Sequence, residues 1–179
     1  WVTKDFFKRP PFVIFSPAVF RRRTLDGFWW DEALRSCNDI DGFLRLSTRA
    51  KFLCVPDVCV TRRITPDSLT IRNDLDISPL AVLIYERFYF HLGGAEYVPG
   101  ALARRWFNRM YRGLAKAHYR AGNRIAAIQL FKKAIKYWPF DQHDYRGLLK
   151  SLLFQRKADN LSDWRMPEPL QPHIAVPQK

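Results

Sequence analysis

The spacing of apolar residues divides the chain into three parts, of which the first two have different periodicities. Up to about Arg72, short apolar runs alternate with turn signals, a pattern typical of an α/β unit. Aromatic and β-branched residues dominate three of these runs, and an apolar face with period 3.6 marks two others. The pattern predicts strands at residues 12–15, 52–55 and 58–61, and helices at residues 18–25 and 39–50.

From Pro79 to about Phe154 the apolar period is that of helices throughout. Gly93-Gly94, Gly122-Asn123 and Trp138-Pro139 interrupt the period and supply the turns. The pattern predicts antiparallel helical hairpins built from helices at residues 80–92, 103–120, 124–137 and 143–154. We therefore expect an α/β part at residues 1–75, an all-α segment at 76–158 and a proline-rich tail at 159–179.

Composition adds a strong positive charge to this picture. The 179 residues include 30 Lys and Arg against 17 Asp and Glu, which gives a net charge of +13. Such a surface attracts polyanions or phosphorylated small molecules, although charge alone does not choose between nucleic acid, anionic lipid and nucleotide diphosphates. The three cysteines and four histidines are scattered without the paired spacing of a zinc site, so no metal ligands are predicted.

Several short motifs follow one another in the first seventy residues. They are Phe15-Ser16-Pro17 with Phe20-Arg21-Arg22, Gly27 to Glu32, Asn38 to Leu46, Val55-Pro56-Asp57, and Arg63 to Thr70. Their order and spacing resemble the second half of the catalytic domain of family-2 glycosyltransferases. The resemblance implies a partial A-type, nucleotide-diphospho-sugar transferase-like α/β fold, with an acceptor pocket at the carboxyl ends of the strands.

Asp39 matches the catalytic base of that family. Inverting sugar transfer needs a carboxylate that takes the proton of an acceptor hydroxyl while its oxygen attacks the anomeric carbon. A helix N-terminus is a suitable mount, since its dipole and free amides favour the ionised carboxylate. The alternative interpretation of Asn38-Asp39 is a plain N-cap. Asn38 replaces an acidic residue of the family and can orient a ligand without adding charge.

Other candidates for contacts with donor or acceptor carry an alternative structural interpretation. Asp41 is either a first-turn helix charge or an acceptor contact. Arg62 and Arg63 either reach a diphosphate or an anionic acceptor, or flank an edge strand. Trp29 and Trp30 either stack on a sugar ring or, as we favour for paired aromatics in a turn, fill the core.

The resemblance also implies a nucleotide-sugar donor and a divalent cation, Mg²⁺ or Mn²⁺, held mostly by residues outside this chain. Two Asp-x-Asp sequences, Asp39 to Asp41 and Asp74 to Asp76, are rejected as the metal motif because neither follows a predicted strand. The donor-binding half of the family is expected before Trp1. We therefore expect the chain to be an incomplete transferase whose activity alone is doubtful.

The helical segment has a second resemblance. Tyr111, Leu114, Ala115, His118, Gly122, Ala127, Phe131, Ala134 and Pro139 fall at the spacings of one tetratricopeptide repeat, over about residues 108–141, with His118 in place of the usual Tyr. Part of the pattern recurs at Tyr145, Leu148, Leu149 and Leu152. The basic, aromatic-rich helices suit a protein partner or an anionic membrane surface, or serve only as a structural appendage. No specific nucleic-acid-binding module is recognisable.

Together these observations predict transfer of a sugar from a nucleotide-sugar donor to a hydroxyl of a glycan, lipid-linked or anionic polymer acceptor, as in cell-envelope glycan synthesis. The alternative is a non-catalytic helical-repeat module that binds a protein, an anionic membrane or nucleic acid. No apolar run is long enough to span a membrane. Low cysteine use fits a reducing compartment, so a cytoplasmic location is expected, with peripheral association at the inner face of the membrane left open.

Overall fold

The computed structural model describes residues 2–9, 17–58, 60–61, 74–153 and 164–174, with only the backbone for residues 74–78. These residues form helices joined by turns and extended segments, and no strand occurs among them. The chain divides into two compact units. Unit 1 comprises Trp1–Pro99 with Pro169–Lys179, and unit 2 comprises Gly100–Glu168.

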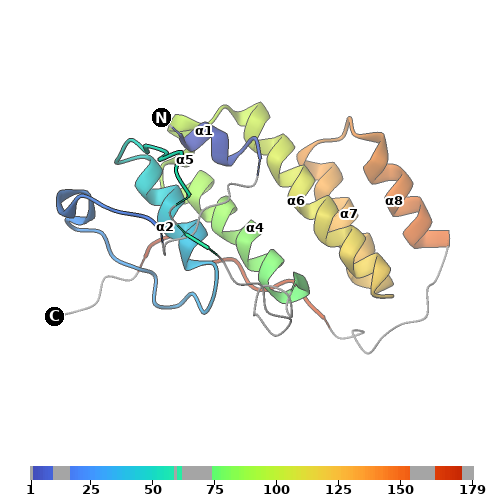
Figure 1. Ribbon diagram of the computed structural model, residues 1–179. Helices are drawn as coiled ribbons and strands as arrows, with labels where there is room; N and C mark the ends of the chain where they lie inside the picture. The colour runs from blue at the N-terminus through green and yellow to red at the C-terminus, as the bar shows by residue number, and fades with distance from the viewer. Residues whose placement is uncertain (1, 10–16, 59, 62–73, 154–163, 175–179) are drawn as a thin grey trace. The chain divides into compact units, whose positions relative to one another are not determined.

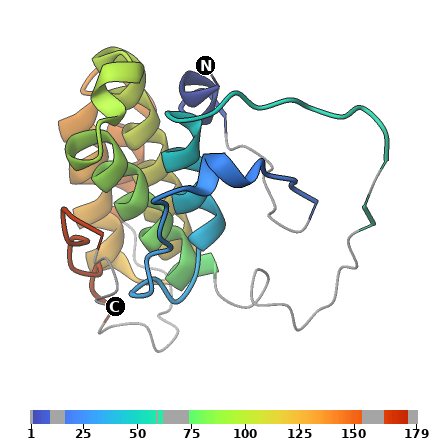
Figure 2. The same ribbon diagram turned by 90° about the vertical axis from the view of Figure 1, so that its left-hand side faces the viewer.

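The expected partial A-type α/β fold is wrong for the part of the chain that the structure describes. Residues 52–55, 58, 60 and 61, predicted as strands, have no strand partner there and lie exposed. Figure 2 shows the segment after α2 (Asn38–Ser47) running away from the helices. Apolar runs of this kind form strands only when neighbouring strands satisfy their backbone groups. The other predicted strand, residues 12–15, lies outside the described residues.

Unit 1 is built around the contact between α2 and α4 (Asp74–His91), which lie side by side in Figures 1 and 2. The short helices α1 (Thr3–Phe6) and α5 (Gly94–Tyr97) complete it, and η1 (Arg22–Leu25) is a single 3-10 turn where a longer helix was predicted. Buried apolar side chains of α1, α2 and α4 form its core; they include Phe6, Phe43, Leu44, Leu46, Leu83, Ile84 and Phe88.

The ends of α4 follow from Pro79 and a glycine pair. Pro79 lies inside α4, which starts six residues before the expected Leu80. Proline lacks a backbone donor and is favoured at the start of a helix over its interior, so the sequence alone indicates a start at this position. At the other end Gly93 has a φ of +81°, a left-handed conformation that favours glycine. Gly94 lies so close to Phe88 that a Cβ there would come within 2.7 Å of its ring.

Unit 2 contains three of the four helices expected at residues 76–158, and the fourth, predicted at residues 80–92, is α4 of unit 1. The helices of unit 2 are α6 (Gly100–Arg120), α7 (Arg124–Tyr137) and α8 (Gln142–Leu153), and α7 contacts both neighbours (Figure 1). Asn123 caps α7 by accepting a hydrogen bond from the backbone N–H of Ala126 at 3.1 Å. Gly147 of α8 packs directly on Phe131, whose ring would lie 2.3 Å from an added Cβ.

Most positions that match the repeat pattern are buried in this hairpin. Tyr111, Ala115, His118, Ala127 and Ala134 are completely buried, and Leu114 and Phe131 nearly so. His118 lies with its ring 3.9 Å from that of Trp164, centroid to centroid. The partial recurrence in α8 differs, since Tyr145, Leu149 and Leu152 are about half exposed. Whether the segment is a tetratricopeptide repeat stays a prediction.

Candidate functional site

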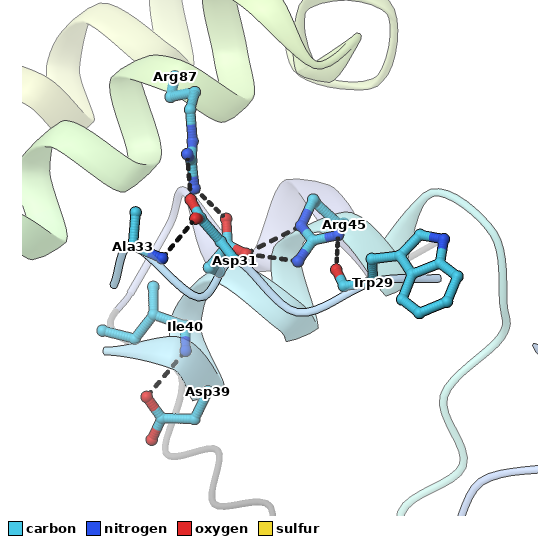
Figure 3. A network of polar contacts seen from close by, with 8 residues as sticks. Trp29, Asp31, Ala33, Asp39, Ile40, Arg45 and Arg87 are labelled. Atoms are coloured by element: carbon cyan, nitrogen blue, oxygen red, sulfur yellow. Dashed lines mark hydrogen bonds and ion pairs between the residues drawn. The ribbon is translucent and has the colours of Figure 1, made fainter. Parts of the chain in front are cut away.

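The polar centre of unit 1 is a buried network of two carboxylates and two guanidinium groups, called here the carboxylate–arginine network: Asp31, Asp41, Arg45 and Arg87 (Figure 3). Arg87 of α4 donates from Nη1 to Asp31 Oδ2 at 2.5 Å and from Nη2 to Asp41 Oδ1 at 2.9 Å. Arg45 donates to Asp41 Oδ2 from Nε at 2.9 Å and from Nη2 at 2.6 Å. Its Nη1 donates to the carbonyl oxygen of Trp29 at 2.9 Å.

Helix geometry accounts for half of this network. Asp41 and Arg45 are four residues apart, so α2 places both side chains on one face. Asp31 comes from the turn before α2, where its Oδ1 also accepts from the backbone N–H of Ala33 at 3.1 Å. The two negative and two positive charges balance. A buried network of this kind fixes α2 against α4, because each buried charge needs its partner.

Asp39 lies on α2 but outside the network. It is half buried in the first turn, and its Oδ1 accepts a hydrogen bond from the backbone N–H of Ile40 at 2.9 Å. Figure 3 shows its carboxylate pointing away from Asp31 and Arg87. Among the described residues Oδ2 has no hydrogen-bond partner. The carboxylate is thus held at a helix N-terminus with one oxygen available.

The N-cap of α2 is neither of the two expected residues. Cys37 occupies that position with a left-handed backbone, φ 60°, and gives no side-chain cap. Burial, reinforced by the charge of Asp39, raises the pKa of the Cys37 thiol to about 11, so the thiol is protonated at neutral pH. The Asn38 amide, in the orientation that satisfies its hydrogen bonds, donates to the carbonyls of Leu34 at 3.0 Å and Ser36 at 3.3 Å. These hydrogen bonds connect Asn38 to the turn that precedes α2.

The remaining candidate residues differ in burial and in their contacts. Asp41 is only 1 % exposed and bound by two arginines, which makes it a structural charge of unit 1. Trp29 and Trp30 are 40 % and 42 % exposed, so the expectation that they fill the core is wrong. The Trp30 ring packs edge-on against Phe28, with centroids 5.0 Å apart. Arg62 and Arg63 lie outside the described residues.

The described residues do not suit a divalent cation. No group of three or more His, Cys, Asp or Glu side chains comes together within the described ranges. Asp31 and Asp41 both bind Arg87, and the charges of Arg87 and Arg45 already neutralise them. The cation implied by the family resemblance therefore has no site among these residues.

Arg87 is the residue that sequence reasoning missed. The signal was present, because Arg87 occupies the same helical face as Leu80, Leu83, Ile84 and Phe88. A guanidinium group on a buried face needs a buried carboxylate. The sequence did not say which carboxylate, since Arg87 is 46 residues from Asp41 and 56 from Asp31.

The site thus consists of one available carboxylate on a helix that a buried, neutral network holds in place. Trp29 is bound through its carbonyl oxygen to Arg45, and Figure 3 shows it well apart from the Asp39 carboxylate. Such an arrangement can accept a proton from a bound hydroxyl, because the carboxylate is oriented by a backbone amide. Comparison of the chain with protein-family models, curated proteins and solved structures finds no match.

Proposed function

We propose that Asp39 is the general base of an inverting sugar transfer from a nucleotide-sugar donor to an acceptor hydroxyl. The observation that carries the proposal is the position of its carboxylate: first turn of α2, half exposed, with Oδ1 engaged by the Ile40 amide and turned away from the network. The order of motifs from Phe15 to Thr70 supports the same reaction class by resemblance.

The reaction requires that this residue be correctly positioned and carry a negative charge. The carboxylate removes the acceptor proton as the acceptor oxygen bonds to the anomeric carbon and the nucleotide diphosphate leaves with the electrons of the broken bond. The helix dipole favours an anion at the N-terminus of α2. The carboxylate–arginine network supports the proposal because it holds α2 rigidly while contributing no net charge.

The donor-binding groups are not assigned to any described residue. The acceptor pocket expected at the carboxyl ends of strands has no counterpart among the described residues, because they form no sheet. The proposal concerns only the acceptor side of the reaction.

The test is an Asp39→Asn substitution in the protein encoded by the whole reading frame, assayed for turnover of nucleotide sugars in the presence of membrane and glycan acceptors. Asparagine retains the oxygen that accepts from Ile40 but cannot take up a proton. We expect kcat to fall by about a hundredfold to ten-thousandfold, with an unchanged circular dichroism spectrum.

The matched control is Asp26→Asn, which changes an exposed aspartate of the same unit and should leave turnover unchanged. Asp41 is unsuitable as a control, because replacing it disrupts the network. If Asp39→Asn turns over substrate at the wild-type rate, Asp39 is not the base.

A second candidate function is that of a non-catalytic binding module formed by unit 2. It is favoured by the half-exposed apolar side chains of Tyr145, Leu149 and Leu152 on α8 and by the positive charge of α6 and α7. This candidate predicts that Asp39→Asn has no biochemical effect, whereas changes on unit 2 abolish binding of its partner.

A further inference from the structure

The helical hairpin formed by α6 and α7 carries an extreme charge imbalance. Residues 100–140 contain no Asp or Glu. Their positive side chains are ten: Arg104, Arg105, Arg109, Arg112, Lys116, Arg120, Arg124, Lys132, Lys133 and Lys136. Arg112 pairs with Asp141 just beyond the hairpin. A surface of this composition attracts anions in a way that depends on salt.

At one end of this hairpin an apolar ring projects from a turn. The turn between α7 and α8 contains Trp138, Pro139 and Phe140, and Phe140 is 78 % exposed. The Phe140 ring lies edge-on to that of Trp138, with centroids 5.5 Å apart. The Arg105 guanidinium carbon lies 4.6 Å from the centroid of the Trp138 ring. The aromatic rings of Trp138 and Phe140 and the guanidinium group of Arg105 therefore lie together in this turn.

The base of the turn is anchored in the core of unit 2. Tyr137 stacks on the buried ring of Tyr111 at 5.7 Å and lies 5.0 Å from that of Phe107, centroid to centroid. Arg112 ties Asp141, the residue after Phe140, back to α6. The turn thus presents Phe140 from a fixed frame, which reduces the entropy lost when the ring is buried by a partner.

We infer that this end of unit 2 docks on an anionic lipid surface, with Phe140 inserted at the headgroup level. Three exposed cations lie at this end of the hairpin. Arg105 of α6 contacts Trp138, Arg104 is its neighbour in the sequence, and Lys136 of α7 comes directly before Tyr137. Their charges therefore lie where lipid headgroups would be. Aromatic rings flanked by Lys and Arg are favoured at the membrane interface. No described helix is both long and apolar enough to cross a bilayer, and docking requires none.

The same observations favour lipid over nucleic acid. Proteins that bind single strands use exposed aromatic faces on which bases stack. Here the guanidinium of Arg105 covers a face of Trp138, and the most exposed ring, Phe140, projects from a turn. The inference is independent of the proposed transferase activity, since it uses no residue of unit 1.

The experiment is co-sedimentation of the full chain with vesicles of equimolar phosphatidylglycerol and phosphatidylcholine, compared with vesicles of phosphatidylcholine alone. We expect binding to the anionic vesicles that weakens with added salt. Phe140→Ser should weaken it by about tenfold or more, because the buried ring is lost. Arg104→Gln and Lys136→Gln should each weaken it by about fivefold.

The matched control is Ile125→Ser, which removes a 67 % exposed apolar side chain at the opposite end of α7. It should bind as the wild type does. As a second readout, Phe140→Trp should show fluorescence quenching by brominated lipid that Ile125→Trp does not. Equal binding by Phe140→Ser and wild type would overturn the inference, as would tighter binding to polynucleotide than to anionic vesicles at the same salt.

Discussion

The carboxylate–arginine network gives the sharpest test of how unit 1 is held together. Arg87→Met keeps the length of an unbranched side chain and removes the guanidinium that joins Asp31 to Asp41. Asp41 keeps the two hydrogen bonds from Arg45, but Asp31 retains only the backbone N–H of Ala33. The substitution thus leaves one buried carboxylate without a countercharge.

The magnitude follows from burial. The side chains of Arg87 and Asp31 are 2 % and 7 % exposed, so solvent screens little of the interaction. Removing one partner of a buried pair costs about 3–5 kcal/mol, whereas an exposed pair is worth about 0–1 kcal/mol. We expect Arg87→Met to lower the free energy of unfolding by about 3–5 kcal/mol. Arg87→Met combined with Asp31→Asn should recover about 1–3 kcal/mol, because the unpaired charge is then absent.

The assay is urea unfolding followed by circular dichroism at the helical band. Hydrogen exchange should localise the loss of protection to α2 and α4, since the network joins these helices. The matched control, Arg22→Met, alters an exposed arginine of the same unit and should change stability by less than about 0.5 kcal/mol. A cost below about 1 kcal/mol for Arg87→Met, or no recovery in the double variant, would refute the buried-pair argument.

Two further predictions concern stability alone. Burial raises the pKa of Tyr85, whose hydroxyl donates to the carbonyl of Phe6 at 3.2 Å. The stability that this protonated hydroxyl contributes to the fold is therefore present below about pH 10 and is lost at higher pH, where the tyrosine of the unfolded chain ionises. Tyr85→Phe should therefore be less stable than wild type by about 1 kcal/mol at neutral pH, with a gap that closes above about pH 10 in urea titrations; a gap independent of pH would contradict this. Gly147→Ala would bring its Cβ into collision with Phe131 and should lower the melting temperature. Gly113→Ala, with open space around the added Cβ, should raise the melting temperature by adding about 0.5–1 kcal/mol of helix stability. Equal effects of the two substitutions would show that the close contact is unimportant.

Helix positions were the most predictable part of the fold. The bounds of α7 agree with the expected 124–137, because Asn123 caps one end and Trp138-Pro139 stops the other. The expected helix at 39–50 appears as α2, one residue earlier at its start and three residues shorter at its end. These signals are local, so a single sequence contains them.

The strands and the network depend on residues far apart in the chain. Residues 52–55 have the composition of a strand, but composition does not supply the neighbouring strand, and none lies among the described residues. For the candidate site, the sequence placed Asp39 at the start of a helix correctly and left Asp41 ambiguous. Only the structure shows that Arg87 selects Asp41 and Asp31 as its partners.

The exposed run after α2 has a practical consequence for handling the protein. Leu53, Val55 and Val58 are 91 %, 58 % and 93 % exposed, so a stretch of apolar, strand-forming composition faces water. Such stretches promote association between protein molecules through backbone hydrogen bonds between strands. Pro56 lacks the N–H that a continuous ladder needs and limits pairing to the short runs on either side. Pro56 and the net charge of +13 should therefore both oppose self-association of the concentrated protein.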